Sequence, residues 1–133
     1  MNSEAHRWIM SARAAQRPVY TELPFMFRNE ARVVHGVMDV LLKRRDDEWV
    51  IIDYKTSKVA AGDFREHAKR YRMQLGIYAA AAQEQLGLAR PPLACLHYIR
   101  GNQMIMLSSE DCQRELDHIE STIGQLTVSD AET

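Results

Sequence analysis

Residues 36–56 read GVMDVLLKRRDDEWVIIDYKT, with two apolar runs on either side of a charged turn. Both runs are rich in β-branched, aromatic and large aliphatic residues, and each has the length of a strand. The pattern predicts a β-hairpin with a solvated tip around Asp46. Asp39, Asp53 and Lys55 stand out within it, because charged side chains are rarely buried unless they are paired or bind a metal.

Hairpin geometry brings the two carboxylates together. If the tip is centred on Asp46, Asp39 lies opposite Asp53, where the Cβ atoms of an antiparallel pair are about 4.5–5.5 Å apart and like charges repel. Lys55 shares a face with Asp53, because side chains alternate along a strand. A divalent cation that prefers oxygen ligands, Mg²⁺ or Mn²⁺, would neutralise this pair. The alternative is a simple Asp–Lys ion pair at the open end of the hairpin, since a register shifted by one residue would turn Asp39 to the other face.

Composition indicates an ordinary globular protein. The chain has 133 residues, of which 46% are hydrophobic and 26% charged, and we expect a single domain over 1–133. The net charge of −1 gives no overall attraction for nucleic acid, so phosphate binding would depend on local basic patches or on metal. Cys95 and Cys112 lack metal-binding spacing and indicate reduced thiols. Because no apolar run reaches transmembrane length, we expect a cytoplasmic protein without a membrane partner.

The remaining chain alternates between helical and strand patterns. The second strand carries apolar residues on both faces, which predicts a central strand covered on both sides, and Gly36 within it indicates a bulge or a close backbone approach. The resulting order is α-βββ-α-ββ-α, an α/β arrangement. We expect a helix at 3–16 capped by Ser3, strands at 19–27, 32–43 and 49–54, a helix from Asp63 to Leu86, strands at 93–99 and 103–107, and a helix capped by Ser108 or Ser109.

The helix from Asp63 to Leu86 carries a basic stripe beside its apolar one. Arg65, Lys69 and Arg72 form this stripe, which is either a solvated face or a surface that tracks nucleic-acid phosphates.

Three further polar positions have a structural and a functional interpretation. Gln74 and Tyr78, four residues apart on the helix, could simply pack. Glu22 reads as a solvent-facing residue of the first strand, unless that strand pairs beside Asp39. His6 reads as a lone surface histidine.

Three short motifs together resemble those of a known family. Residues Gly36–Asp39 fit GxxD, Asp53–Lys55 fit DYK and Gln74–Tyr78 fit QxxxY, in the order and at spacings similar to those of RecB-type nuclease domains. These domains belong to the PD-(D/E)XK nuclease superfamily. The resemblance covers about residues 19–86, and it implies a restriction-endonuclease-like fold with a mixed central sheet flanked by helices.

The resemblance also implies roles for individual residues. Asp39 and Asp53 would bind Mg²⁺ or Mn²⁺, together with the backbone carbonyl of Tyr54. Lys55 would position the attacking water and stabilise charge, and Glu22 matches an acidic residue that the family often carries on the strand before GxxD.

Other matching residues would support the site or contact DNA, namely Gln74 and Tyr78. Many family members also have a metal-binding histidine well upstream of the sheet. His6 is a poor match to it, so this chain is either the C-terminal piece of a longer protein or lacks that ligand.

The function implied by the resemblance is Mg²⁺-dependent hydrolysis of DNA phosphodiester bonds. It favours an exonuclease module of DNA repair or recombination, working with a helicase domain or subunit. The alternative is a nuclease-fold domain that binds DNA or a helicase partner without cutting, for which the missing upstream histidine is the main argument. The chemistry fits the residues, because phosphodiester cleavage requires acidic metal ligands and a cation that stabilises developing charge.

Overall fold

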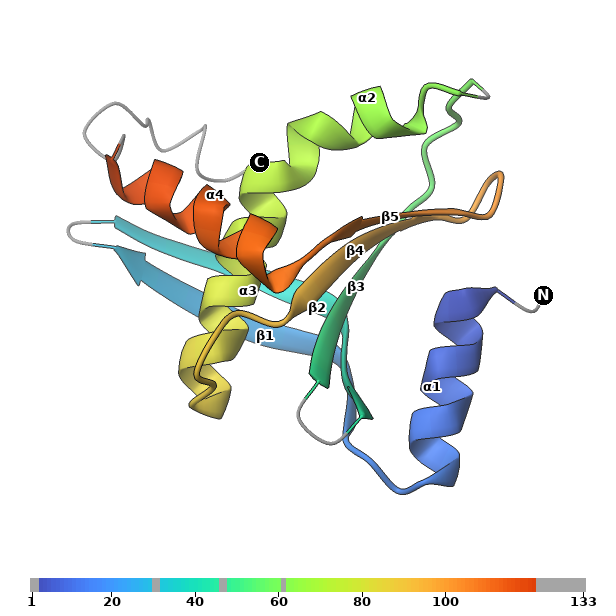
Figure 1. Cartoon of the computed structure of the whole chain (residues 1–133), viewed down its shortest axis with the longest axis horizontal. Helices are drawn as coiled ribbons and strands as arrows, with labels where there is room; N and C mark the ends of the chain where they lie inside the picture. The colour runs from blue at the N-terminus through green and yellow to red at the C-terminus, as the bar shows by residue number, and fades with distance from the viewer. Residues whose placement is uncertain (1–2, 30–31, 46–47, 61, 122–133) are drawn as a thin grey trace.

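The predicted order of helices and strands is confirmed, with the middle helix divided into three pieces. The computed structural model describes residues 3–29, 32–45, 48–60 and 62–121 (Figure 1). Its elements are helix α1 (Glu4–Ala14), strands β1 (Val19–Asn29), β2 (Arg32–Arg45) and β3 (Glu48–Lys55), helix α2 (Phe64–Ala68), 3₁₀ turn η1 (Lys69–Tyr71), helix α3 (Arg72–Leu86), strands β4 (Leu93–Tyr98) and β5 (Gln103–Leu107), and helix α4 (Ser109–Ser121).

The strands form one mixed sheet in the order β1-β2-β3-β4-β5. Strands β3 and β4 pair in parallel, and the connection between them runs through α2 and α3, as parallel neighbours require. The other neighbouring strands are antiparallel. Helices α3 and α4 cover one face of the sheet and α1 packs on the other (Figure 1). The predicted α/β sandwich with a mixed central sheet is therefore present.

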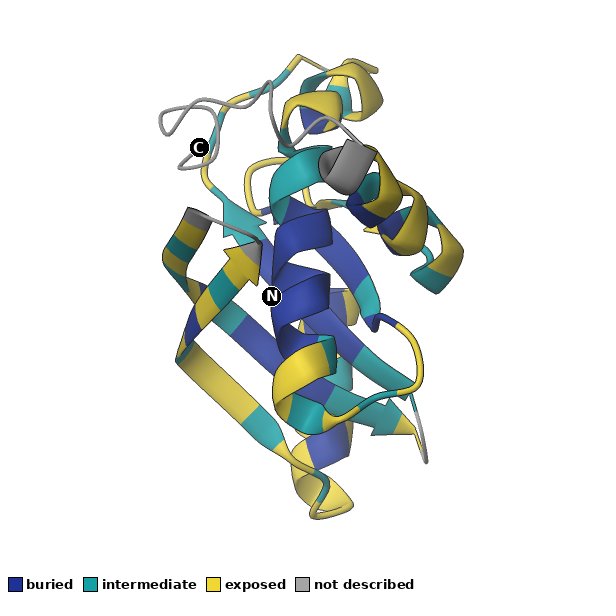
Figure 2. Cartoon of the chain, turned by 90° about the vertical axis from the view of Figure 1, so that its left-hand side faces the viewer, coloured by how far each residue is buried: buried dark blue, intermediate teal, exposed yellow. Residues whose placement is uncertain are grey.

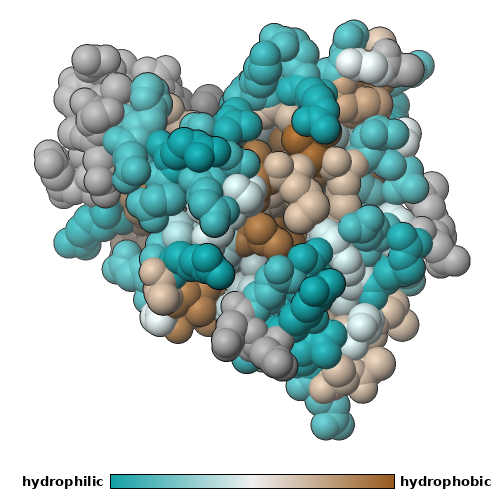
Figure 3. Space-filling model, viewed as in Figure 1, coloured by the Kyte–Doolittle hydropathy of each residue, from teal (hydrophilic) through white to brown (hydrophobic). Residues whose placement is uncertain are grey.

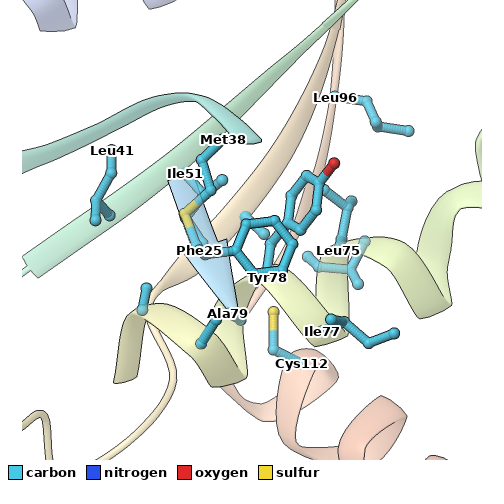
Figure 4. Packing of buried hydrophobic residues seen from close by; sticks show 14 of the residues in the cluster. Phe25, Met38, Leu41, Ile51, Leu75, Ile77, Tyr78, Ala79, Leu96 and Cys112 are labelled. Atoms are coloured by element: carbon cyan, nitrogen blue, oxygen red, sulfur yellow. The ribbon is translucent and has the colours of Figure 1, made fainter. Parts of the chain in front are cut away.

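Helix α3 is the centre of the larger hydrophobic core. Every residue from Leu75 to Ala82 is buried, because the sheet lies on one side of the helix and α4 on the other (Figure 2). The small residue Gly76 permits this contact, since an added Cβ would lie 2.8 Å from Cβ of Glu115 on α4. Phe25, Met38, Ile51 and Cys112 meet α3 from the neighbouring elements (Figure 4).

Helix α1 covers a smaller core on the opposite face. The hydroxyl oxygen of Ser3 accepts a hydrogen bond from the backbone N–H of His6 at 3.0 Å, which confirms the predicted cap. Ala5 is fully buried, and Trp8 and Ile9 pack beside it against the sheet. The expected apolar stripe is thus the face by which α1 attaches.

The middle helix differs from the prediction. A 3₁₀ turn at 69–71 interrupts it, so its first turn and a half is separate from α3. The predicted capping box is also wrong: Asp63 makes no side-chain cap hydrogen bond, and Glu66 forms an ion pair with Lys69 at 2.8 Å. The periodicity is helical on both sides of the turn, so the apolar pattern alone conceals the interruption.

The expectation that β2 is covered on both faces holds for only part of the strand. Residues 40–42 are buried, whereas Val33 and Val37 are 44% and 50% exposed. The far end of the β1–β2 hairpin extends beyond α1, which leaves one of its faces without a covering helix (Figure 1).

The surface is otherwise that of a globular domain. Hydrophilic side chains cover most of the face seen in Figure 3, and apolar side chains gather near its centre. Cys95 and Cys112 are buried free thiols, as expected. In the ranges that the structure describes, every helix is too short or too polar to cross a membrane.

Candidate active site

The site lies where the side-chain alternation of two strands is interrupted. In β1, Val19 packs in the α1 core but Leu23 packs in the α3 core, although both have odd numbers. In β2, Val40 packs in the α1 core and Met38 in the α3 core, although both have even numbers. A regular strand would keep residues of equal parity on one face, so each strand is irregular between these positions.

The interruptions occur at two acidic residues that lie side by side. The pairs Thr21–Val40 and Leu23–Met38 flank them, which places Glu22 opposite Asp39. Glu22 has φ +50°, a conformation that non-glycine residues seldom adopt, and it is exposed. The strand of Glu22 therefore pairs beside Asp39. This was the condition for considering Glu22 as a functional residue.

The register of the β2–β3 hairpin also agrees with the prediction. Val40 pairs with Ile52, so one further step along both strands places Asp39 opposite Asp53. The tip itself, residues 46–47, lies outside the described residues. The Oδ2 atom of Asp39 accepts a hydrogen bond from the backbone N–H of Tyr54 at 2.8 Å, so this carboxylate is fixed against β3.

Asp53 is more deeply buried than Glu22 and Asp39. Only 5% of it is exposed, and its pKa is raised to about 6. Burial is the largest cause, the charge of Asp39 acts in the same direction, and Lys55 acts against both. Nζ of Lys55 lies 3.0 Å from Oδ2 of Asp53, so the simpler Asp–Lys ion pair is present. Lys55 acts on this carboxylate as a charge partner and lowers its pKa, and beyond Lys55 no side chain of the described residues makes a hydrogen bond to the buried Oδ2 atom. A buried carboxylate oxygen without a hydrogen bond suits a cation.

Lys55 is held from three sides. Besides Asp53, the amide oxygen of Gln74 lies 3.5 Å from Nζ, and the ring centroid of Tyr71 lies 4.0 Å from it. The side chain is 17% exposed. Gln74, the first residue of the third motif, thus contacts the lysine of the second motif, and its role is more than helix packing.

The first and third motifs meet through an aromatic pair. A Cβ added to Gly36 would lie 2.6 Å from Cε1 of Phe25, so the glycine leaves room for this ring. This agrees with the close approach to the backbone that was predicted at Gly36. The ring of Phe25 packs edge-on against Tyr78, with centroids 4.9 Å apart (Figure 4). Burial, together with the charges of Asp53 and Asp39, raises the pKa of Tyr78 to about 12, so its hydroxyl stays protonated.

A pocket between α1 and the sheet contains a residue that the sequence reasoning underrated. Glu22, Asp39 and Tyr54 line the pocket from the sheet, and His6 and Arg13 line it from α1. His6 is a surface histidine, as predicted, but it faces the acidic residues. A signal was available in the sequence: His6, Met10 and Arg13 are spaced four and three apart, which places them on one side of the predicted helix.

These residues do not close into a complete ligand set. No group of three or more His, Cys, Asp or Glu side chains is poised around a metal within the described residues. The two carboxylates of Asp39 and Asp53 are the best placed to hold Mg²⁺, which usually takes one or two protein carboxylates and keeps several waters.

The basic stripe is partly engaged in ion pairs. Arg65 is exposed on α2, Lys69 pairs with Glu66, and Nε of Arg72 lies 3.2 Å from Glu115 on α4. Arg72 therefore joins α3 to α4. Contact of Arg65, Lys69 and Arg72 with DNA stays a prediction, as do the roles assigned to the individual site residues.

Comparisons with known proteins identify the family of the chain. Residues 2–130 match the family model of the PD-(D/E)XK nuclease superfamily. An ATP-dependent helicase/nuclease subunit from Pelotomaculum thermopropionicum is 41% identical over 78 residues, which cover 59% of this chain and 6% of that protein. The ATP-dependent helicase/nuclease subunit from Thermoanaerobacter sp. (strain X514) is 34% identical over 73 residues, which cover 55% of this chain and 6% of that protein.

Among solved structures, the crystal structure of SSO0001 matches with a TM-score of 0.48 and 17% identity, over 93% of this chain and 59% of that one. The match to each of these two helicase/nuclease subunits spans only about one-sixteenth of that subunit's length.

Proposed function

The chain belongs to the PD-(D/E)XK nuclease superfamily, and on this basis we propose that it hydrolyses phosphodiester bonds of DNA with the help of Mg²⁺ or Mn²⁺. The observation that carries the proposal is the buried Oδ2 atom of Asp53, which has no hydrogen-bond partner in the described chain and lies beside Asp39 and Lys55. A purely structural ion pair would account for Lys55 but not for a second carboxylate next to Asp53.

Asp39 and Asp53 would hold the cation, with the backbone carbonyl of Tyr54 as a further oxygen ligand. When bound, the cation supplies charge neutralisation for the phosphate and activation of the attacking water. The ammonium of Lys55 lies beside the carboxylate of Asp53, where it would orient water and stabilise the negative charge that develops on the phosphate. Glu22 and His6 border the pocket and are the residues that could complete the ligand set.

The residues around these groups keep them in place. Gln74 holds the amine of Lys55, and the hydrogen bond from Tyr54 fixes the carboxylate of Asp39. Tyr78 stays neutral beneath the carboxylates and supports them by packing. Arg65, Lys69 and Arg72 would contact phosphates of the bound strand.

The finer proposal is an exonuclease of DNA repair or recombination that works with a helicase in the cytoplasm. It is supported by the names of the relatives, which are helicase/nuclease subunits. The second candidate is a nuclease-fold domain that binds DNA without cutting it. The observation that favours it is the absence of a three-residue ligand cluster among the described residues.

Incubation of the purified chain with DNA tests the proposal. We expect cleavage of linear DNA with Mg²⁺ or Mn²⁺ and none with EDTA, and a loss of about 10²–10³-fold for Lys55→Ala, as for removal of one preorganised charge-stabilising group. Asp53→Ala should also abolish cutting. Glu84→Ala, which removes an exposed carboxylate on α3, is the matched control. Closed circular DNA as a second substrate separates exonuclease from endonuclease activity.

Calorimetric titration with Mn²⁺ distinguishes residues that bind the metal from residues that act in another way. Asp53→Ala should weaken Mn²⁺ binding, Lys55→Ala should leave it nearly intact, and His6→Ala should weaken it if the histidine is a ligand. Tight DNA binding with no cleavage under any metal would establish the second candidate instead. Equal Mn²⁺ affinity in wild type and Asp53→Ala would show that the metal assignment is wrong.

A further inference from the structure

Tyr71 lies over the lysine of the candidate site. Its ring centroid is 4.0 Å from Nζ of Lys55, a distance typical of a cation–π contact. Tyr71 is the last residue of the 3₁₀ turn that interrupts the middle helix, and it belongs to none of the three motifs. The helix interruption, which no proline or glycine explains, thus occurs where this ring meets Lys55.

The ring of Tyr71 packs against His67, which in turn contacts Tyr98. The His67 ring lies 5.7 Å from that of Tyr71, and Nδ1 of His67 shares a hydrogen bond with the hydroxyl of Tyr98 at 2.7 Å. Tyr98 is fully buried and is the β4 neighbour of Lys55 in the parallel pair, where the N–H of Ile99 also donates to the carbonyl of Lys55 at 3.0 Å. The backbone that carries Lys55 and the ring above its amine are therefore connected through one packed cluster.

We propose that Tyr71 is a positioning residue that holds the ammonium of Lys55 beside Asp53 through the face of its ring. The proposal rests on the function proposed above. A lysine side chain has four rotatable bonds, so holding its ammonium in one place costs conformational entropy. Three contacts share this task; Asp53 carries a charge, whereas the amide of Gln74 and the ring of Tyr71 do not.

The lack of charge gives the ring a role that Asp53 cannot fill. A carboxylate that also holds a cation has less negative charge to offer a lysine, whereas the ring competes neither for the cation nor with the phosphate. Tyr71 would therefore keep Lys55 in place while Asp53 is engaged with metal and DNA. The hydroxyl of Tyr71 plays no part in this, so phenylalanine should replace it.

Nuclear magnetic resonance tests the placement without any cleavage reaction. In the full chain labelled at lysine, protons on Cε of Lys55, assigned through Lys55→Arg, should be displaced upfield by the ring current of Tyr71. The displacement should persist in Tyr71→Phe and vanish in Tyr71→Leu. Lys55 signals at the ordinary lysine position in the wild type would overturn the proposal.

Cleavage kinetics test the consequence. At saturating linear DNA and Mn²⁺, Tyr71→Leu should lower the cleavage rate on the order of tenfold, the effect of losing one partly desolvated cation–π contact, while the Kd for DNA is unchanged. Tyr71→Phe should retain the wild-type rate. The matched control is Phe64→Leu, because Phe64 packs against Tyr98 in the same cluster, with centroids 5.1 Å apart, and has no recorded contact with Lys55.

The remaining results of these two experiments also decide for or against the proposal. A tenfold loss in Phe64→Leu at equal melting temperature would mean that general packing of the cluster matters, and would overturn the assignment to Tyr71. A Tyr71→Phe variant as slow as Tyr71→Leu would show that the hydroxyl acts, which also contradicts the proposal. If the wild type cleaves no DNA, the proposed function fails, and the resonance displacement alone decides whether the ring holds Lys55.

Discussion

Replacing Asp53 by asparagine should stabilise the protein when no metal is present. Burial raises the pKa of Asp53 from its ordinary 3.8 to about 6, so the ionised carboxylate is disfavoured in the folded state. At 1.36 kcal/mol per pKa unit, the difference corresponds to roughly 3 kcal/mol of unfolding free energy at neutral pH. Asparagine removes this cost. The pKa of about 6 already includes the opposing effect of Lys55, and relaxation and water entry reduce the cost of the buried charge, so we expect a net gain of about 1–2 kcal/mol. For a domain of this size, that gain raises the Tm by about 4–8 °C.

The pH dependence identifies the group responsible. The folded-state pKa lies above the unfolded-state one, so the contribution of Asp53 to stability is greatest below about pH 3.8 and is lost as the pH rises through about 6. Asparagine does not titrate. The Tm difference between Asp53→Asn and wild type should therefore be full at pH 7.5 and shrink as the pH falls below about 6.

Thermal melting with and without metal completes the assay. In EDTA at pH 7.5 the variant should melt above the wild type. Mn²⁺ at 100 times its Kd should stabilise the wild type by about 2.7 kcal/mol and the variant little, so the difference should narrow or reverse. Asp63→Asn is the control, because Asp63 is exposed and its side chain makes no cap hydrogen bond. A variant that melts below the wild type in EDTA and gains as much from Mn²⁺ would refute the reasoning, since Asp53 would then be only an ion-pair partner.

Two further predictions concern the basic stripe and the glycine of the first motif. Replacing Arg65, Lys69 and Arg72 by alanine should weaken DNA binding for every sequence and flatten its salt dependence by about 0.9 in log–log slope per lost phosphate contact, measured by fluorescence anisotropy; an unchanged slope would show a merely solvated face. Gly36→Ala should cost about 1–3 kcal/mol in urea unfolding because its Cβ would meet Phe25, and should cost less in a Phe25→Leu background; equal costs in both backgrounds would contradict the close approach.

Sequence reasoning succeeded where the chemistry is local. Counting seven residues on either side of Asp46 placed Asp39 opposite Asp53. The structure reaches the same register through an irregularity between Lys43 and Arg45, without which the pairing of Arg45 with Glu48 would place Asp39 opposite Tyr54. The close approach at Gly36 followed from the lack of a side chain in a strand. Both features depend on pairs of residues in adjacent strands, β2 with β3 for the carboxylates and β1 with β2 for Gly36.

The features that sequence reasoning missed are set by tertiary contacts. The apolar stripe from Phe64 to Leu86 fits an unbroken helix, whereas the structure places a 3₁₀ turn at 69–71, where Tyr71 contacts Lys55 of a distant strand. His6 gains importance only because α1 packs against the sheet with that side toward the pocket. The helix break leaves no pattern in its own segment, and the shared side of His6, Met10 and Arg13 does not say which part of the sheet α1 covers.

The reversed alternation in β1 and β2 explains how the fold tolerates this concentration of acidic residues. In a regular sheet covered by helices on both faces, every strand position would point into one core or the other, and a carboxylate at any of them would be costly. At the level of Glu22 and Asp39 the apolar side chains change face, so both acidic residues escape the cores and line the pocket beside α1. Asp53 lies on β3, for which no such irregularity is recorded, and it is the carboxylate whose pKa is raised. The electrostatic cost of the site therefore falls on Asp53. A cation bound at Asp53 would offset that cost and stabilise the folded protein.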